Sequence, residues 1–203
     1  MDKSYSAPKT AIVIAAGGQG SRLRRNKPKL TLGGVSLLDR TVSKAQAWGG
    51  PVAIAVAEQG QVATCELPIL VDQWHDHGPI SALQNAFRFA DSRHCSHVLL
   101  LGCDMPFLPE DLLKRLAQSI GESGAAIPVS NSRPQFMAGL WKVSSPTLED
   151  YLAKGHKSLW QYAQAQGAVR VEWDSDEASD PFADIDTQAD LEAAEQRLAN
   201  SRL

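Results

Sequence analysis

The chain has 203 residues, 43% of them hydrophobic and 21% charged, which is the composition of an ordinary globular protein and enough for one α/β domain with a substantial core. Its formal net charge of −3 argues against nucleic-acid and anionic-membrane binding, because proteins that bind a phosphate backbone usually carry a concentrated basic face. No apolar run reaches the roughly 18–20 residues that span a bilayer, and the polar start lacks the apolar stretch of a signal peptide. We therefore expect a cytoplasmic protein with no nucleic-acid and no membrane partner.

Apolar runs of strand length alternate with amphipathic segments along the first 120 residues. The expected strands are 10–16, 52–57, 68–71 and 97–101, and the expected helices begin near Ser36 and span 80–90 and 109–120, the last with Pro109 in its first turn. Because parallel strands need crossover connections, this alternation predicts an α/β fold. Its form is a three-layer, mostly parallel twisted sheet with helices on both faces.

The pattern loosens beyond residue 124. The expected strands there are 125–129, 136–143, 169–173 and 182–186, and the expected helices are 146–153, 158–166 and 188–199. Thr187 and Asp190 have the spacing of a capping box at the start of the last helix.

A glycine-rich segment follows the first expected strand directly, at Gly17-Gly18-Gln19-Gly20-Ser21-Arg22. Glycines let backbone N–H groups approach phosphate oxygens closely. The segment is neither a Walker loop, which ends in Gly-Lys-Ser/Thr, nor the dinucleotide fingerprint, since Leu23 stands where a third glycine belongs. It predicts either a phosphate-binding loop, favoured by the basic Arg22 and Lys27, or a plain strand-to-helix turn.

A carboxylate, Asp104, ends the most apolar expected strand and precedes Pro106. Exposed at that point it could hold Mg²⁺, which bridges phosphate oxygens and usually needs only one or two protein carboxylates. Asp184 and Asp186 alternate in the last expected strand and would lie on the same side of it. For Asp186, a metal ligand and a cap or solvated turn remain equally open.

Several motifs, in this order, resemble those of the MobA-like nucleotidyltransferases. They are Ala16-Gly17-Gly18-x-Gly20-Ser21-Arg22-Leu23, Lys27-x-x-Leu30-x-Leu32-x-Gly34, Asp72 with Gly78-Pro79-Ile80, Cys103-Asp104-Met105-Pro106, and Phe182-Ala183-Asp184-Ile185-Asp186-Thr187. The stretch Tyr151-Leu152-x-x-Gly155-x-Lys157-Ser158 is similar to the family's molybdenum cofactor guanylyltransferases. The resemblance runs from Thr10 to about Leu198. Its spacing favours Lys27 over Lys29 as the family's loop lysine.

The resemblance implies a Rossmann-like nucleotidyltransferase fold and a division of the chain. A flexible N-terminus, 1–9, would precede a single nucleotidyltransferase domain, 10–200. Within it, residues 10–123 would bind the nucleotide, 124–187 the acceptor, and 188–200 would form a closing helix.

The implied reaction transfers GMP from GTP to the phosphate of molybdenum-loaded molybdopterin and releases pyrophosphate, with Mg²⁺, or Mn²⁺ in its place, as cofactor. Arg22, Lys27 and Asp104 would be catalytic, and Asp104 and Asp186 would bind the metal. The implied nucleotide-binding residues are Ala15, Ala16, Gly17, Gly18, Gln19, Gly20, Ser21, Arg22, Lys27, Asp72, Gly78 and Asp104. Transient contacts with proteins of the cofactor pathway are a further implication.

Some residues depart from the pattern and leave the base and the acceptor open. Ala55 and Ala57 stand where guanylyltransferases tend to have asparagines, and Arg133 stands where they tend to have histidine. The aspartates at 184 and 186 look more like the cytidylyltransferase branch. The alternatives are therefore a molybdopterin cytidylyltransferase, another NTP transferase acting on a sugar or polyol phosphate, and a non-catalytic nucleotide-binding module.

Other reactive residue types favour plainer interpretations. Cys65, Cys95 and Cys103 are odd in number and have no C-x-x-C spacing, which predicts reduced thiols, and Cys103 has no nearby base that would make it a nucleophile. His75-Asp76-His77 reads as a solvated loop. Trp141 and Trp160 read as core or interface anchors.

Overall fold

An eight-stranded sheet forms the middle layer of the protein, whose computed structural model describes residues 8–17, 27–63, 66–72, 78–176 and 179–201. Its strands are β1 (Thr10–Ala15), β4 (Val52–Val56), β5 (Ile69–Val71), β6 (His97–Gly102), β7 (Ala125–Ser130), β8 (Arg133–Pro134), β9 (Leu140–Lys142) and β10 (Val169–Trp173). The order across the sheet is β10-β7-β9-β6-β1-β4-β5, with β8 paired to β7. Neighbours are parallel except at β8 and β9, so the predicted mostly parallel sheet is confirmed.

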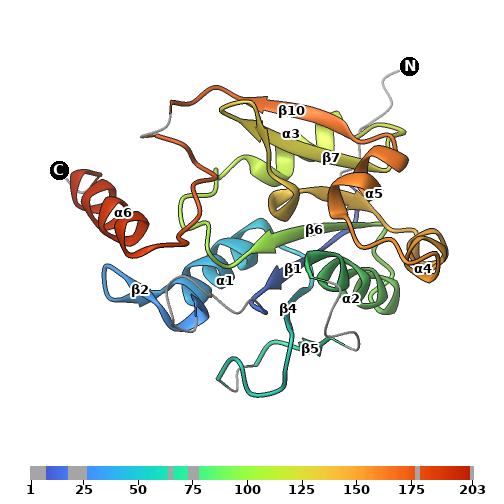
Figure 1. The fold of residues 1–203 in the computed structure, drawn as a ribbon, viewed down its shortest axis with the longest axis horizontal. Coiled ribbons are helices and arrows are strands. Elements are labelled where there is room, and N and C mark those ends of the chain that lie inside the picture. Colours follow the sequence, from blue (N-terminus) through green and yellow to red (C-terminus); the bar gives the residue numbers. More distant parts are fainter. Residues whose placement is uncertain (1–7, 18–26, 64–65, 73–77, 177–178, 202–203) are drawn as a thin grey trace.

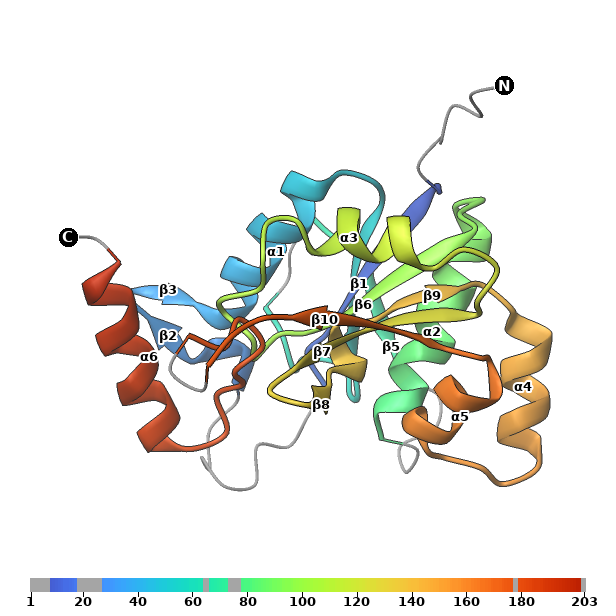
Figure 2. The same ribbon diagram turned by 90° about the horizontal axis from the view of Figure 1, so that it is seen from above.

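Helices cover both faces of this sheet (Figure 1). They are α1 (Leu37–Trp48), α2 (Pro79–Ser92), α3 (Leu112–Ser119), α4 (Ser145–Ala153) and α5 (Leu159–Ala165). Seen from above, α1 and α3 lie on one side of the sheet and α2, α4 and α5 on the other (Figure 2). The three layers expected from the sequence are therefore present.

The period-two alternation of β1 builds one hydrophobic core on each side of the sheet. Ile12 and Ile14 belong to the cluster that contains Leu116 of α3, whereas Ala11 and Val13 belong to the cluster that contains Phe87 of α2. These four side chains, from the middle of β1, are fully buried. A strand buried on both faces is continuously apolar, which is why this part of the fold can be predicted from sequence.

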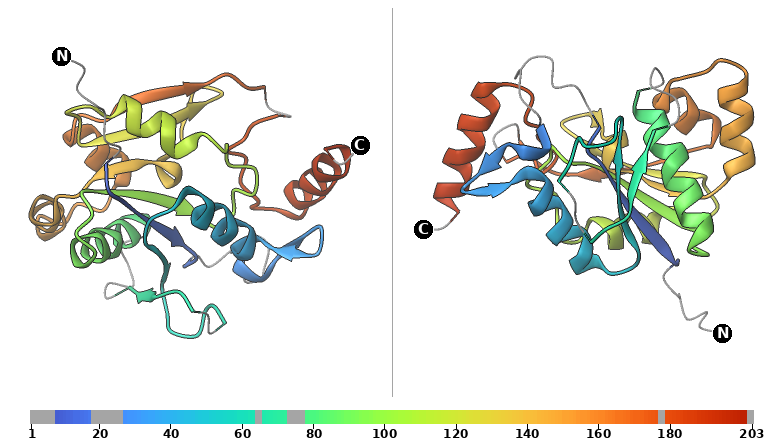
Figure 3. Two further views of the ribbon diagram at one scale, coloured as in Figure 1. Left: turned by 180° about the vertical axis from the view of Figure 1, so that it is seen from behind. Right: turned by 90° about the horizontal axis from the view of Figure 1, so that it is seen from below.

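A third, smaller cluster joins the two ends of the chain. Helix α6 (Gln188–Asn200) packs beside the hairpin of β2 (Thr31–Leu32) and β3 (Val35–Ser36), as both views in Figure 3 show. The buried residues of this cluster are Leu30, Leu32, Leu37, Ile185 and Ala194. The predicted capping box at the start of α6 is confirmed, because Thr187 and Asp190 exchange side-chain to backbone hydrogen bonds.

Three expected elements were wrong in part. Helix α3 begins at Leu112, because residues 109–111 form a turn in which the Leu112 N–H donates to the Pro109 carbonyl. Residues 136–143 form a short 3-10 helix, η2 (Phe136–Ala138), before the strand β9. The segment 182–186 is no strand, because the Ile185 N–H donates to the carbonyl of Asp104 instead of to a neighbouring strand. The β2–β3 hairpin had no counterpart among the expected elements.

The cysteines and tryptophans that the structure describes have different environments. Cys95 and Cys103 are buried free thiols, as expected, and Cys65 lies outside the described residues. Trp141 is fully buried, whereas Trp160 is 48% exposed and is no part of the core. Among the described helices, none is long and apolar enough to cross a membrane.

Candidate active site

The carboxyl ends of four adjacent parallel strands, β6, β1, β4 and β5, meet at one edge of the sheet. Gly17, Asp72 and Asp104 follow β1, β5 and β6 and are thereby brought to this edge. The ladder continues past the strand ends, where the Asp72 N–H donates to Val56 O at 2.8 Å and the Cys103 N–H to Ala15 O at 3.2 Å. Open α/β sheets bind ligands at such an edge.

Gly17 lies where the chain leaving β1 passes closest to β4. A Cβ atom at this position would be 2.3 Å from the Ala57 nitrogen and 2.9 Å from the Val56 carbonyl carbon. The turn after β4 is itself held closed, because the Gln61 side-chain oxygen accepts from the N–H groups of Ala57, at 2.7 Å, and Glu58, at 3.1 Å. Only glycine fits at 17, and the role of Gln61 in this turn could not be read from the sequence.

Lys27 joins the two predicted metal ligands. Its Nζ donates to Asp104 Oδ2 at 2.9 Å and also to Asp186 Oδ1. The Lys27 side chain is only 14% exposed, compared with 25% for Asp104 and 42% for Asp186. Lys29, by contrast, is exposed and makes no polar contact with the described residues. The structure therefore brings together the three residues that the sequence singled out, and Lys27, unlike Lys29, contacts both carboxylates.

Backbone contacts position these three side chains. Lys27 opens the 3-10 helix η1 (Lys27–Lys29), which is closed by a Leu30 N–H to Lys27 O bond of 3.0 Å. At the other end of the chain, the Asp190 carboxylate accepts from the Asp186 N–H at 3.0 Å, and the Ile185 N–H donates to Asp104 O at 3.0 Å. The cap of α6 thus fixes Asp186 beside Asp104.

The charges of this cluster shift two pKa values. Burial alone would lower the pKa of Lys27, but the charges of Asp104 and Asp186 and the hydrogen bonds to them outweigh it and raise the pKa, so Lys27 is a permanent cation. The pKa of Asp184 is raised, first by partial burial of its carboxyl group and then by the charges of Asp186 and Asp104. Asp184 is exposed, but it lies close enough to Asp186 and Asp104 for their charges to affect its pKa.

The carboxylates fit a magnesium ion. Asp104 and Asp186 already converge on one cationic atom, and hard carboxylate oxygens are the ligands that Mg²⁺ prefers. In the part of the chain that the structure describes, no group of three or more His, Cys, Asp or Glu side chains forms a metal cage. A pair of carboxylates completed by phosphate oxygens and water is the usual arrangement for Mg²⁺ at a nucleotide.

Asp72 is held by two polar side chains of α2. Its carboxylate accepts from Ser81 Oγ at 2.7 Å and from Asn85 Nδ2 at 2.6 Å. Gly78, with a φ of 61°, precedes the helix and places Pro79 in its first turn. Ser81 and Asn85 were not among the expected site residues, although two polar residues four positions apart in an apolar helix were the available signal.

The remaining motif residues are Cys103 and two segments that the structure does not describe. Burial, followed by the charge of Asp104, raises the pKa of Cys103 to about 12, which disfavours the thiolate form that a nucleophile needs. Gly18, Gln19, Gly20, Ser21 and Arg22 lie outside the described residues, as do His75, Asp76 and His77.

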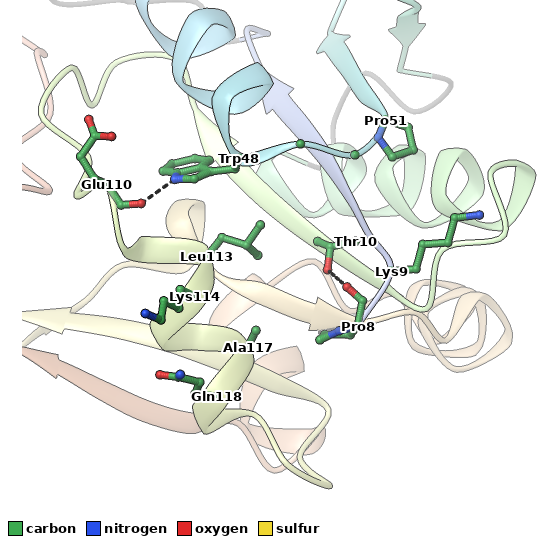
Figure 4. Close-up of a pocket in the computed structure, with 12 residues that line it drawn as sticks. Pro8, Lys9, Thr10, Trp48, Pro51, Glu110, Leu113, Lys114, Ala117 and Gln118 are labelled. Atoms are coloured by element: carbon green, nitrogen blue, oxygen red, sulfur yellow. Dashed lines mark hydrogen bonds between the residues drawn. The ribbon is translucent and has the colours of Figure 1, made fainter. Parts of the chain in front are cut away.

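A pocket of about 550 Å³ lies at the opposite edge of the sheet, where β1 and β4 begin (Figure 4). Its walls include Trp48, Leu113 and Ala117, and the Trp48 ring nitrogen donates to the Glu110 carbonyl at 2.7 Å. The full length of the parallel strands β1 and β4 lies between this pocket and the carboxyl edge of the sheet. It is therefore distinct from the site around Asp104.

Comparisons with known proteins find a family match and similar proteins over most of the chain. Residues 12–180 match the model of the MobA-like NTP transferase domain. The chain is 32% identical to a molybdenum cofactor guanylyltransferase of Rhodobacter capsulatus, over 93% of this chain and 96% of the relative. It is 34% identical to the protein of the same name from Acidiphilium cryptum, over 90% and 92% of the two chains.

The fold also resembles a solved structure. The crystal structure of molybdopterin-guanine dinucleotide biosynthesis protein A from Archaeoglobus fulgidus matches with a TM-score of 0.77, over 94% of this chain and 99% of that one, at 20% identity. The two chains thus share one fold over nearly all of the residues compared.

Proposed function

Because this chain belongs to the MobA-like NTP transferase family, we propose that it transfers GMP from GTP to the terminal phosphate of molybdopterin, in molybdenum cofactor biosynthesis. The relatives named molybdenum cofactor guanylyltransferase, which match 93% and 90% of the chain, support the guanylyl group and the acceptor. The observation that carries the chemistry is the convergence of Lys27, Asp104 and Asp186 beside Gly17, at the carboxyl edge of the sheet.

In this reaction a phosphate oxygen of the acceptor forms a bond to the α-phosphorus of GTP, and the bond to the β-phosphate oxygen breaks. The acceptor phosphate is already ionised near neutral pH, so no general base is needed. The residues instead hold the reactants in line and stabilise the negative charge that develops on the leaving pyrophosphate.

Each described residue has one part in this scheme. The backbone at the end of β1, from Ala15 to Gly17, would lie against the triphosphate, and Asp104 with Asp186 would hold Mg²⁺, which would neutralise charge at the phosphate oxygens. Lys27 stabilises the departing pyrophosphate. Asp72, held by Ser81 and Asn85, would contact the nucleotide, as the resemblance implies. By the resemblance alone, Gly18 to Arg22 complete the triphosphate site.

The two parts of the chain divide the substrates. We assign the nucleotide to residues 10–123 and the acceptor to residues 124–187, with residues 188–200 as the closing helix. The enzyme would use cytoplasmic GTP.

Ranking the four nucleoside triphosphates by thermal shift with Mg²⁺ tests the base. We expect GTP to raise the melting temperature most, by roughly 5–10 °C at a hundredfold excess over its Kd, since such an excess stabilises a protein by about 2.7 kcal/mol. Release of pyrophosphate with GTP and molybdopterin completes the test. A clear preference for CTP would establish the cytidylyltransferase alternative, and binding without turnover of any triphosphate would establish the non-catalytic one.

Gly102→Ala is expected to lower activity through the position of Asp104. The added methyl group would be 2.6 Å from Asp104 Oδ1, a side-chain atom that can move, so the carboxylate turns away from Lys27 while the strand survives. A displacement of about 1 Å can cost roughly 10²-fold in rate, which steady-state pyrophosphate release measures.

A double variant tests this route. If Gly102→Ala acts through the carboxylate, adding it to Asp104→Asn lowers the rate no further, because the two changes remove one interaction. Additive losses would show that the methyl group acts elsewhere, for example on Met105, whose Cε it would approach to 3.1 Å.

A further inference from the structure

Lys27 lies where a divalent metal between Asp104 and Asp186 would have to lie. Its ammonium group contacts one oxygen of each carboxylate, and these two residues are 82 positions apart in the sequence. Two carboxylates that lie close enough to contact the same ammonium group would repel each other without a cation between them. Lys27 therefore holds the metal ligands together in the structure described here.

The two cations exclude one another from this position. Mg²⁺ takes carboxylate oxygens at about 2.0–2.1 Å, inside the 2.9 Å that separates Lys27 Nζ from Asp104 Oδ2. A metal in contact with the same two oxygens would bring two positive charges close together in a site that is partly shielded from water. Lys27 must leave the carboxylates when the metal arrives.

The side chain of Lys27 can move while its backbone stays in place. Pro28 and Leu30 are buried on either side of the exposed Lys29, so packing fixes η1 and its surroundings. The four-carbon stem of a lysine carries a compact charge that can turn about several single bonds. A triphosphate bound beside Gly17 would offer that charge a new anionic partner.

We propose that Lys27 and the divalent metal are alternative cations for the Asp104–Asp186 pair, so that the metal enters as the nucleotide draws Lys27 away. This inference rests on the proposed function for the nature of the nucleotide. Lys27 is then a placeholder in the free protein and a phosphate ligand in the complex. Metal alone binds weakly, and metal and nucleotide strengthen each other's binding.

The test measures Mn²⁺ binding to the full-length protein without nucleotide, from the electron paramagnetic resonance signal of free Mn²⁺. Lys27→Gln removes the competing charge, so its Mn²⁺ affinity is expected to exceed that of the wild type by roughly fivefold or more, the lower end of typical coupling between sites. Lys27→Arg keeps the charge and should bind no more tightly than the wild type. Lys29→Gln, in the same 3-10 helix, is the matched control and should leave the affinity unchanged.

A second measurement gives the effect of nucleotide binding on Mn²⁺ affinity. It repeats the first with a GTP analogue that has a methylene group between the α- and β-phosphates. The analogue should tighten Mn²⁺ binding less in Lys27→Gln than in the wild type, because the variant has no competing ammonium to withdraw. Equal or weaker Mn²⁺ binding by a folded Lys27→Gln, without nucleotide, would overturn the inference. If Lys27→Gln does not fold, tighter nucleotide-free Mn²⁺ binding by Lys27→Arg than by the wild type would overturn it as well.

These outcomes separate the inference from the proposed function. If the wild type transfers a guanylyl group and Lys27→Gln has unchanged Mn²⁺ affinity, the exchange of Lys27 for the metal is contradicted and the proposed function is supported. If Lys27→Gln binds Mn²⁺ more tightly but the wild type transfers no guanylyl group, the exchange is supported and the proposed function is contradicted.

Discussion

Asp104→Asn should lower the rate of guanylyl transfer by roughly 10²–10³-fold, the usual cost of removing one preorganised electrostatic group from an active site. Asparagine has nearly the same shape, and the backbone carbonyl that accepts from Ile185 is unchanged, so the fold is kept. What is lost is the negative charge that contacts Lys27 and would hold the metal. Pyrophosphate release at saturating GTP and Mg²⁺ measures the effect.

Glu110→Gln is the matched control, because this carboxylate is 89% exposed and pairs with Lys44 instead of with the site. Its rate should equal that of the wild type. An Asp104→Asn protein that melts at the wild-type temperature and turns over within a factor of three or so of its rate would contradict the assignment of Asp104, since an electrostatic group of this kind is worth far more.

Gly17→Ala should lower both activity and stability. Its methyl group would meet the backbone nitrogen of Ala57 at 2.3 Å and the carbonyl carbon of Val56 at 2.9 Å, at the end of β4, and backbone held there cannot turn aside as a side chain can. The end of β1 must therefore move away from β4, at a cost of about 1–3 kcal/mol in the free energy of unfolding. A shift of about 1 Å in the chain beside the triphosphate lowers the rate by roughly 10²-fold.

Gly121→Ala separates these two effects. Gly121 has a φ of 49° and open space around its Cα, so alanine strains the backbone there without a clash, beyond the end of α3 and away from the site. It should cost about 1–2 kcal/mol in stability and leave the rate per folded molecule intact. Chemical denaturation and pyrophosphate release, measured on both variants, decide the matter: equal rates for the two would exclude a special role for Gly17.

The central strands could be predicted because burial on both faces leaves a simple signature. β1, β4 and β6 are continuous apolar runs, and each observed strand agrees with its expected bounds to within one residue. The segment 182–186 gave a false signal. Its alternation of apolar and acidic residues suits a strand, but Phe182 packs edge-on against Trp173 and Ile185 packs among the leucines that follow Lys27, and no described strand pairs with the segment.

The site was predicted in its parts and not in its assembly. Residue types and spacing pointed to Lys27, Asp104 and Asp186 separately. Nothing local shows that one ammonium group contacts both carboxylates, because these contacts cross 77 and 159 residues of chain. Asp186 was expected in a strand, with a metal ligand and a cap or solvated turn equally open, whereas the cap of α6 holds it beside Asp104. Ser81 and Asn85 were missed because their partner, Asp72, lies on another element.

The small cluster that joins Leu30, Leu32 and Leu37 to Ile185 and Ala194 also determines when the site can form during synthesis. A ribosome makes the N-terminal part first, and most of the sheet can pair before residue 180 leaves the exit tunnel. Until Ile185 and Ala194 emerge, the leucines after Lys27 lack their apolar partners, and Asp186 is absent from its place beside Lys27. A nascent chain can therefore form most of its sheet well before Asp186 joins Lys27, and the proposed site is complete only once α6 has been made.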